Sequence, residues 1–206
     1  MPTLFFVRHA ESEANARLEY AGHLPVSLTE KGKKEANHTA TNFLKDHTIT
    51  RIYSSPLLRA QQTATFFSQK CNLKIEVNPL LEEQNMGIYS GQAYAVTEKL
   101  PCFEPDVSKR WNWAPKNGET YGQVANRACK FLEQIQYQNK TENILVVTHG
   151  VFLRLMRGAL ENTLPVFYSG LTKNCEILKS NFSQLNKAHK IESLYFGEPD
   201  NRIHLE

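Results

Sequence analysis

The stretch TLFFVRHAESEAN, residues 3–15, places an uncharged apolar run directly before a basic pair. Thr3 to Val7 are β-branched, aliphatic or aromatic, which is typical of a buried strand. Arg8 and His9 follow this strand at once. A basic pair in that place is either the ordinary start of a loop or the floor of an active site, and the residues elsewhere in the chain distinguish the two.

Strand-like and helix-like stretches alternate after this first strand. A polar loop follows it, and then a predicted helix opens with Thr29 as a candidate N-cap. The predicted helices cover 29–46, 57–70, 121–135 and 151–161, and the predicted strands cover 3–7, 51–55, 73–77, 143–150, 174–180 and 189–196. This alternation predicts an α/β fold, a three-layer sandwich in which a mainly parallel sheet has helices on both faces.

Length and patterning favour one domain over residues 1–206. The stretch at about 92–117 interrupts the alternation and is a candidate cap insertion above one edge of the sheet. With 41% hydrophobic and 22% charged residues, the chain has the composition of a soluble globular protein. Its apolar runs are too short for a signal peptide or a membrane span, so we expect a cytoplasmic protein.

Charge and cysteine usage exclude several classes of partner. The formal net charge is +3, and lysines and arginines alternate with acids without forming a basic stripe. We therefore expect neither a nucleic acid nor a membrane as partner. The four cysteines include no C-x-x-C pair, which argues against a zinc site or a disulfide framework.

Basic side chains follow three of the predicted strands. Arg8 and His9 end the first strand, Arg59 comes shortly after the second, and His149 with Gly150 ends the strand at 143–150. Ligands of parallel α/β sheets bind at the carboxyl ends of the strands, so these residues can converge in space. Each histidine alone would most often be structural, but two imidazoles with two arginines at helix starts suit a phosphate group.

Six short motifs in a fixed order carry a resemblance to a known family. They are RHAESEAN at 8–15, LTEKGKKEA at 28–36, SSPLLRAQQTA at 54–64, LLEEQNMGIYSG at 80–91, NGET at 117–120 and ILVVTHG at 144–150. Each motif is weak by itself, but their order is specific. The chain resembles branch 1 of the histidine phosphatase superfamily, which has the phosphoglycerate mutase-like fold.

The resemblance implies catalytic roles. His9 would be the nucleophile that accepts the phosphoryl group, because neutral imidazole is available near pH 7 and a covalent intermediate divides one displacement into two. Arg8, Arg59 and His149 would bind the equatorial phosphoryl oxygens without a metal or a cofactor. Further substrate contacts are expected from three positions, Ser12, Asn15 and Gly150.

A proton donor for the leaving alcohol is expected in the motif at 80–91. Glu83, four residues before Gly87, matches the family's acid/base, and Glu82 is the runner-up. As an acid it would protonate the ester oxygen, and as a carboxylate it would activate the water that cleaves phosphohistidine.

Two residues depart from the family pattern. Ala10 stands where the family usually has glycine, and if this position requires a positive φ the alanine costs about 1 kcal/mol or more. The carbonyl of Ala10 can still accept a hydrogen bond from the non-attacking nitrogen of His9. Ser90 stands where many relatives carry a glutamate, which removes one carboxylate from the same loop.

Three functions fit these residues. The first is a metal-independent phosphatase that hydrolyses small phosphomonoesters through phosphohistidine, and the alternative is phosphoryl transfer of the phosphoglycerate mutase type. Only 26 residues separate Gly91 from Gly118, whereas mutases of the family carry a longer segment that shields phosphohistidine from water, so hydrolysis is favoured. A phosphate-recognising adaptor is disfavoured because all five catalytic candidates are present. The partner expected is a small phosphorylated substrate, and the sequence leaves both its identity and a homodimer open.

Overall fold

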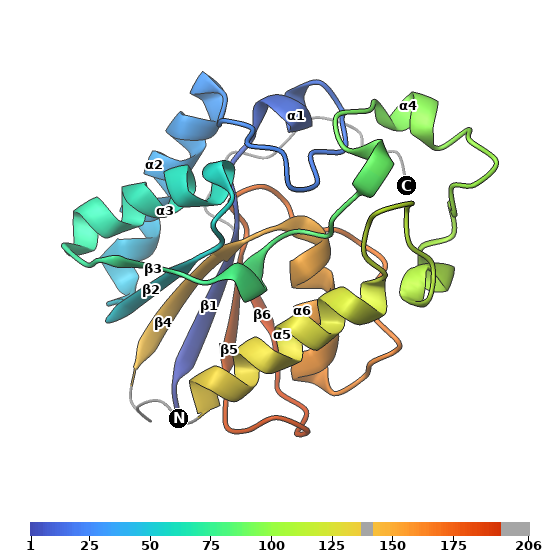
Figure 1. Cartoon of the computed structure of the whole chain (residues 1–206). Helices are drawn as coiled ribbons and strands as arrows, with labels where there is room; N and C mark the ends of the chain where they lie inside the picture. Colours follow the sequence, from blue (N-terminus) through green and yellow to red (C-terminus); the bar gives the residue numbers. More distant parts are fainter. Residues whose placement is uncertain (137–141, 195–206) are drawn as a thin grey trace.

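The computed structural model describes residues 1–136 and 142–194, and its centre is a mixed β-sheet. Within these residues the sheet has six strands in the order β3-β2-β4-β1-β5-β6 (Figure 1). The strands are β1 Thr3–Arg8, β2 Arg51–Ser54, β3 Ile75–Val77, β4 Asn143–Thr148, β5 Ile177–Asn181 and β6 Glu192–Leu194. Strands far apart in the sequence, β1 and β4, therefore lie side by side at the middle of the sheet.

Strand directions confirm the prediction of a mainly parallel sheet. The four strands β3, β2, β4 and β1 are parallel, and β5 runs antiparallel to both β1 and β6. In the register between β1 and β4, Val7 lies opposite Val147 and Arg8 opposite Thr148. The two strands thus end at the same level, with Arg8 at the last pair.

Four long helices cover the two faces of the sheet. They are α2 Glu30–Asp46, α3 Leu58–Cys71, α5 Tyr121–Gln136 and α6 Gly150–Glu161. Figure 1 shows α2 and α3 on one face and α5 and α6 on the other, which is the predicted three-layer arrangement. Thr29 caps α2 as expected, because its hydroxyl accepts the backbone N–H of Gly32 at 2.9 Å.

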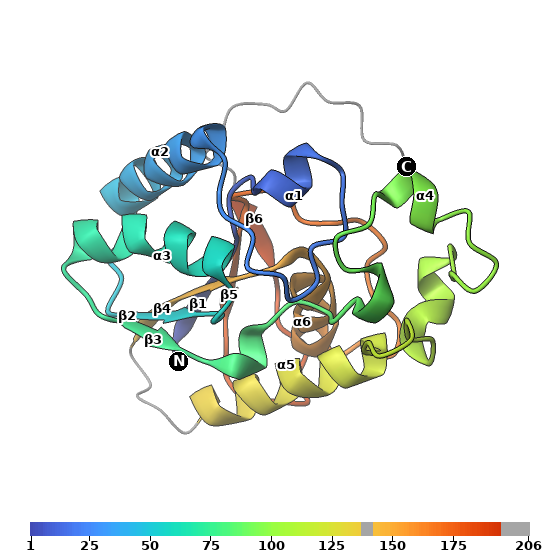
Figure 2. The same cartoon turned by 45° about the horizontal axis from the view of Figure 1, so that its top comes forward.

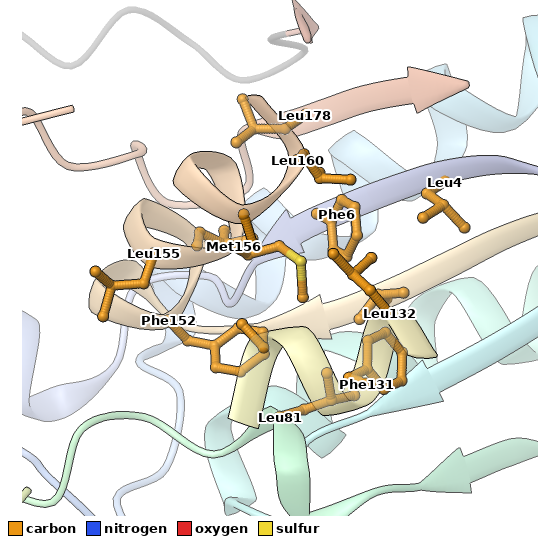
Figure 3. Packing of buried hydrophobic residues seen from close by; sticks show 14 of the residues in the cluster. Leu4, Phe6, Leu81, Phe131, Leu132, Phe152, Leu155, Met156, Leu160 and Leu178 are labelled. Carbon is orange, nitrogen blue, oxygen red and sulfur yellow. The ribbon is translucent and has the colours of Figure 1, made fainter. Parts of the chain in front are cut away.

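The alternating side chains of β1 explain why its residues 4–7 are all apolar. Leu4 and Phe6 pack on the face covered by α5 and α6, as the view in Figure 3 shows. Phe5 and Val7 point to the opposite face and join the cluster formed with α2 and α3. A strand buried on both faces needs apolar residues at every position, and burial of each large side chain contributes about 1.5–3 kcal/mol.

The polar stretch after β1 differs from its prediction as a loop. It contains a short helix, α1 Glu13–Ala16, with Ser12 as N-cap. Ser12 and Asn15 form a reciprocal capping box, in which each side chain accepts the other residue's backbone N–H. Sequence reasoning missed this helix because the third residue after the cap is an asparagine in place of the usual glutamate or glutamine.

The other short elements lie in the connections. They are the 3₁₀ turns η1 Pro79–Leu81, η2 Gly87–Tyr89 and η3 Val107–Trp111, and the helix α4 Tyr94–Thr97. Both α4 and η3 belong to the stretch at 92–117, which Figure 1 places beside the carboxyl-terminal edge of the sheet. Its interior contains Phe103, whose ring lies 4.7 Å from the Arg110 guanidinium.

The last strand, predicted at 189–196, is shorter than expected. β6 covers Glu192–Leu194, and residues 195–196 lie outside the described residues.

Among residues 1–136 and 142–194, no helix has both the length and the apolar character needed to cross a bilayer.

Candidate active site

The ends of β1, β2 and β4 bring the predicted site residues together. The backbone N–H of His9 donates to the Thr148 carbonyl at 2.9 Å, so the residue after β1 is fixed beside the end of β4. The rings of His9 and His149 lie 5.1 Å apart between centroids. Figure 2 shows the loop after β1, with α1, beside this edge of the sheet. The hydrogen bond and the ring distance bring residues distant in sequence together.

His9 presents one unprotonated ring nitrogen to the site. Its Nδ1 lies 2.8 Å from the Ala10 carbonyl oxygen, and because a carbonyl only accepts, Nδ1 carries the proton. Its Nε2 accepts the Nε–H of Arg59 at 3.2 Å. Burial, followed by the cations Arg59 and Arg8, lowers the pKa of His9 well below its usual value. The imidazole is therefore neutral and has its Nε2 lone pair oriented toward Arg59.

Ala10 fits its position without the strain that a positive φ would have caused. It is fully buried, and its N–H donates to the Thr63 hydroxyl at 3.1 Å. The non-glycine residues with positive φ in the described part of the chain are Leu18, Asn72, Asn117, Asn162, Cys175 and Asn186. Ala10 is not among them, so the condition for a conformational cost is not met. The hydrogen bond from His9 to its carbonyl is present, as expected.

Two guanidinium groups flank His9 without carboxylate partners. Arg59 is 1% exposed and donates to the carbonyls of Gly22 and Leu24 at 2.8 and 3.2 Å. Arg8 donates to the Thr172 carbonyl at 2.6 Å, and its buried Nε has no partner. Burial lowers the pKa of Arg59 to about 10 and also lowers that of Arg8. Within residues 1–136 and 142–194 neither forms an ion pair, so their charges are available to an anion.

His149 lies at the start of α6 beside these cations. Its Nε2 is 2.8 Å from the Ser55 hydroxyl, whereas its buried Nδ1 has no partner. Burial lowers the pKa of His149 well below its usual value, and Arg59 acts in the same direction. Gly150 follows as the first residue of α6, and a Cβ at this position would lie 3.4 Å from the Arg8 guanidinium carbon.

Of the two candidate acids, Glu83 is the one at the amino end of α6. Its carboxylate accepts the backbone N–H groups of Gln84 at 2.9 Å, Phe152 at 3.1 Å and Val151 at 3.2 Å. It therefore caps α6 in place of His149, whose side chain makes no cap hydrogen bond. The structure places the backbone carbonyl of Glu82 against Arg127 at 2.8 Å.

Residues of the motif NGET, at 117–120, stabilise the loop that contains Glu82 and Glu83. Its Glu119 carboxylate accepts from Arg127 Nη2 at 2.9 Å and from the backbone N–H of Asn85 at 2.9 Å. Arg127 also donates to the carbonyls of Leu80 and Glu82, both at 2.8 Å, and to that of Glu83 at 3.2 Å. One ion pair thus fixes the backbone on both sides of Glu83.

Ser12 and Asn15 lie in the turn before and within α1. The Ser12 hydroxyl donates to Asn15 Oδ1 at 3.0 Å and accepts the Asn15 N–H at 3.3 Å. The Ser12 N–H also donates to Asn15 Oδ1, at 3.1 Å. The Ser12 hydroxyl and the amide oxygen of Asn15 are therefore both engaged in hydrogen bonds. The NH₂ group of Asn15 takes no part in these three bonds.

Three further residues adjoin the site and were not predicted. His23 Nε2 donates to the Glu83 carbonyl at 2.7 Å, and Asn174 Nδ2 donates to the His9 carbonyl at 2.7 Å. The Tyr94 phenol interacts electrostatically with Arg8, Arg59 and Glu83, and burial raises its pKa. His23 lies in the polar stretch after β1, Tyr94 begins the short helix α4, and Asn174 precedes β5 although it was predicted as the first residue of a strand. No motif that we singled out contains any of the three.

Comparisons with known proteins agree with this geometry. The family model of the histidine phosphatase superfamily (branch 1) matches residues 4–187. Phosphoserine phosphatase 1 of Hydrogenobacter thermophilus is 34% identical over 165 residues, which cover 78% of this chain and 76% of that protein. The metal-independent phosphoserine phosphatase of Arabidopsis thaliana is 35% identical over 156 residues, covering 73% of this chain and 65% of that protein.

A solved structure supports the fold. The mycobacterial glucosyl-3-phosphoglycerate phosphatase complexed with VO3 aligns over 95% of this chain and 99% of that chain, with a TM-score of 0.80 and 22% identity. Given the family match over residues 4–187, the chain belongs to branch 1 of the histidine phosphatase superfamily.

Proposed function

We propose that the chain is a metal-independent phosphatase that hydrolyses small phosphomonoesters, with His9 as nucleophile. The observation that carries the proposal is the neutral His9 with its Nε2 lone pair beside two buried guanidinium groups. A phosphate dianion placed there would receive charge-assisted hydrogen bonds from Arg8 and Arg59, which have no carboxylate partner among the described residues. The phosphatase names of the relatives agree with this chemistry.

In the first step His9 Nε2 attacks phosphorus, and the bond from phosphorus to the ester oxygen breaks. Protonated Glu83 gives its proton to the leaving alcohol, and the phosphoryl group remains on His9. Glu83 Oε1 accepts two backbone N–H groups and Oε2 accepts one, so Oε2 is the oxygen that we assign to carry the proton. General acid assistance of this kind contributes about 10²–10⁴-fold to rate.

In the second step the Glu83 carboxylate takes a proton from water as the water oxygen attacks phosphorus. The phosphorus–nitrogen bond breaks, and inorganic phosphate leaves with His9 neutral again. Arg8 and Arg59, with His149, would bind the equatorial oxygens in both steps. The unpartnered Nδ1 of His149 is the ring atom we assign to this contact.

The remaining predicted contacts take supporting roles in this proposal. Asn15 would donate its NH₂ group to a phosphoryl oxygen, and Ser12 would hold the amide in that orientation. Gly150 would contact the substrate beside Arg8, since a Cβ at this position would lie 3.4 Å from the guanidinium carbon. The stretch at 92–117 would act as a cap within one domain over 1–206, supported by the electrostatic interaction of Tyr94 with Arg8 and Arg59. The small phosphorylated substrate and the cytoplasmic location expected from the sequence belong to the same proposal.

A phosphatase assay on a panel of phosphomonoesters in EDTA tests the function. We expect release of inorganic phosphate, an acid-labile phosphoenzyme in rapid-quench samples, and loss of both in His9→Ala. Activity that survives in His9→Ala, or that requires a divalent metal, would overturn the mechanism. Release of an isomerised substrate in place of phosphate would indicate phosphoryl transfer of the mutase type.

A further inference from the structure

Three connecting segments that adjoin the catalytic groups contain no Asp, Glu, Lys or Arg. They are 20–28 (YAGHLPVSL), 86–97 (MGIYSGQAYAVT) and 162–172 (NTLPVFYSGLT). Each contributes one side chain to the surroundings of the catalytic groups: Leu24, Tyr94 and Leu171. We call these three residues the apolar rim. The inference drawn from them rests on the proposed function and concerns the alcohol part of the substrate.

Contacts with the catalytic groups place each rim residue. The Leu24 backbone lies beside Arg59, because its carbonyl accepts a hydrogen bond from that residue at 3.2 Å, and its Cδ1 lies 3.3 Å from the point where a Cβ of Gly91 would stand. Leu171 Cδ2 and the Arg8 guanidinium carbon both lie 3.4 Å from the point where a Cβ of Gly150 would stand, so Leu171 is beside Arg8. Tyr94 interacts electrostatically with Arg8, Arg59 and Glu83. The rim therefore borders the groups that would hold the phosphate and protonate the alcohol.

Two of the rim side chains, Leu24 and Leu171, are open to solvent in spite of their apolar character. Leu24 is 42% exposed and Leu171 is 50% exposed, and the Tyr94 ring contacts Tyr20 at 4.4 Å between centroids. Of the charged residues near the first segment, Arg17 pairs with Glu19 at 3.0 Å. When an apolar group of a ligand covers such exposed apolar surface, both are removed from water, and this makes the free energy of binding more favourable.

We infer that the apolar rim binds the leaving alcohol, and that the enzyme prefers phosphomonoesters of uncharged, apolar alcohols over those whose alcohol carries an ammonium or carboxylate group. The phosphate would lie among Arg8, Arg59 and His149, and the alcohol carbons would cover Leu24 and Leu171. A zwitterionic alcohol such as serine would meet no opposite charge on the three segments and would lose part of its hydration there.

A series of n-alkyl phosphates from ethyl to hexyl tests the inference, because the leaving-group pKa hardly changes while the apolar area grows. We expect kcat/KM to rise about two- to fourfold for each added methylene that reaches the rim, given the free energy of burying a methylene. O-phosphoserine should react more slowly than butyl phosphate. Leu24→Asn and Leu171→Asn should flatten the rise while inhibition by inorganic phosphate stays unchanged.

Val166→Asn is the matched control, since Val166 lies in the same segment as Leu171 and is 72% exposed. It should keep the full dependence on chain length. Hydrolysis of every ester at one rate, or a preference for O-phosphoserine, would overturn the inference and leave the phosphatase proposal standing.

Binding of n-alkyl phosphonates, measured by calorimetry, separates the two proposals if no ester is hydrolysed. Affinity that increases with chain length would support the rim and overturn the proposed turnover. An affinity independent of chain length would overturn the inference about the rim, whether or not the protein hydrolyses the esters.

Discussion

The carboxyl ends of β1, β2 and β4 carry the cationic part of the site, whereas uncharged connections at 20–28, 86–97 and 162–172 surround it. In the cationic part the side chains are held by hydrogen bonds to backbone, as in the bond of His9 to Ala10 and those of Arg59 to Gly22 and Leu24. In the rim, Leu171 has half of its surface exposed.

This difference in burial and hydrogen bonding determines which substitutions each part of the site tolerates. A substitution in the cationic part leaves buried donors or acceptors without partners, and that costs about 1–3 kcal/mol per group before any effect on catalysis. A substitution of an exposed rim residue changes stability little. We therefore expect the chemistry to depend on the strand ends and the choice of substrate to depend on the connections.

The largest effect expected among the following changes comes from Glu83→Gln. The amide oxygen can still accept the N–H groups of α6, but the side chain can neither give a proton to the alcohol nor take one from water. We expect kcat on an alkyl phosphate to fall about 10²–10⁴-fold, and the loss on an aryl phosphate to be smaller in the first step because that leaving group needs less protonation. Single-turnover kinetics with both esters measure this difference.

Glu82→Gln is the control for this substitution, because it makes the same replacement of a carboxylate by an amide at the neighbouring residue. Its kcat should stay close to that of the unchanged protein. Equal losses in both variants would show that neither glutamate is the specific acid, and would break the assignment of the proton donor to the amino end of α6.

A smaller effect is expected on stability as the pH changes. Burial and neighbouring arginines lower the pKa of His9 and of His149 in the folded protein, so below pH 6.5 the unfolded chain binds more protons than the folded one. The free energy of unfolding should therefore fall as the pH decreases below about 6.5, by up to about 1.4 kcal/mol per pH unit for each histidine. Thermal unfolding between pH 5 and 8 measures the slope.

Bound inorganic phosphate is expected to change this dependence of stability on pH. A bound dianion favours protonation of His149, so saturating inorganic phosphate should raise the melting temperature more at pH 5.5 than at pH 8. His149→Asn should reduce the pH dependence without phosphate. A melting temperature that is independent of pH, with or without phosphate, would contradict the neutral buried pair.

The smallest effect expected is that of Ala10→Gly. Ala10 does not have a positive φ, so the family's usual glycine relieves no strain here and adds entropy to the unfolded chain. We expect a loss of about 0.4–1 kcal/mol in the free energy of unfolding and an unchanged kcat. Chemical denaturation and the phosphatase assay check the two parts. A stabilised Ala10→Gly variant would show that alanine is strained beside the nucleophile.

Much of the fold could be predicted because strands buried on both faces contain unbroken apolar runs, as at 4–7 and 144–147. The short helix α1 was missed since its cap uses Asn15, and β6 came out shorter than its apolar pattern suggested. The capping of α6 by Glu83 could not be predicted either. It depends on two segments 68 residues apart in the chain, and no local pattern encodes that contact.

The sequence by itself determined the family, the alternation of strands and helices, and the set of residues at the strand ends, because motif spacing and apolar periodicity are local properties. Only the tertiary structure decided that Nδ1 of His9 carries its proton, that Glu83 lies at the amino end of α6, and that Leu24, Tyr94 and Leu171 border the cations. Protonation and burial depend on which atoms from distant segments lie within a few ångströms of each other, and packing of the sheet and its helices fixes that proximity.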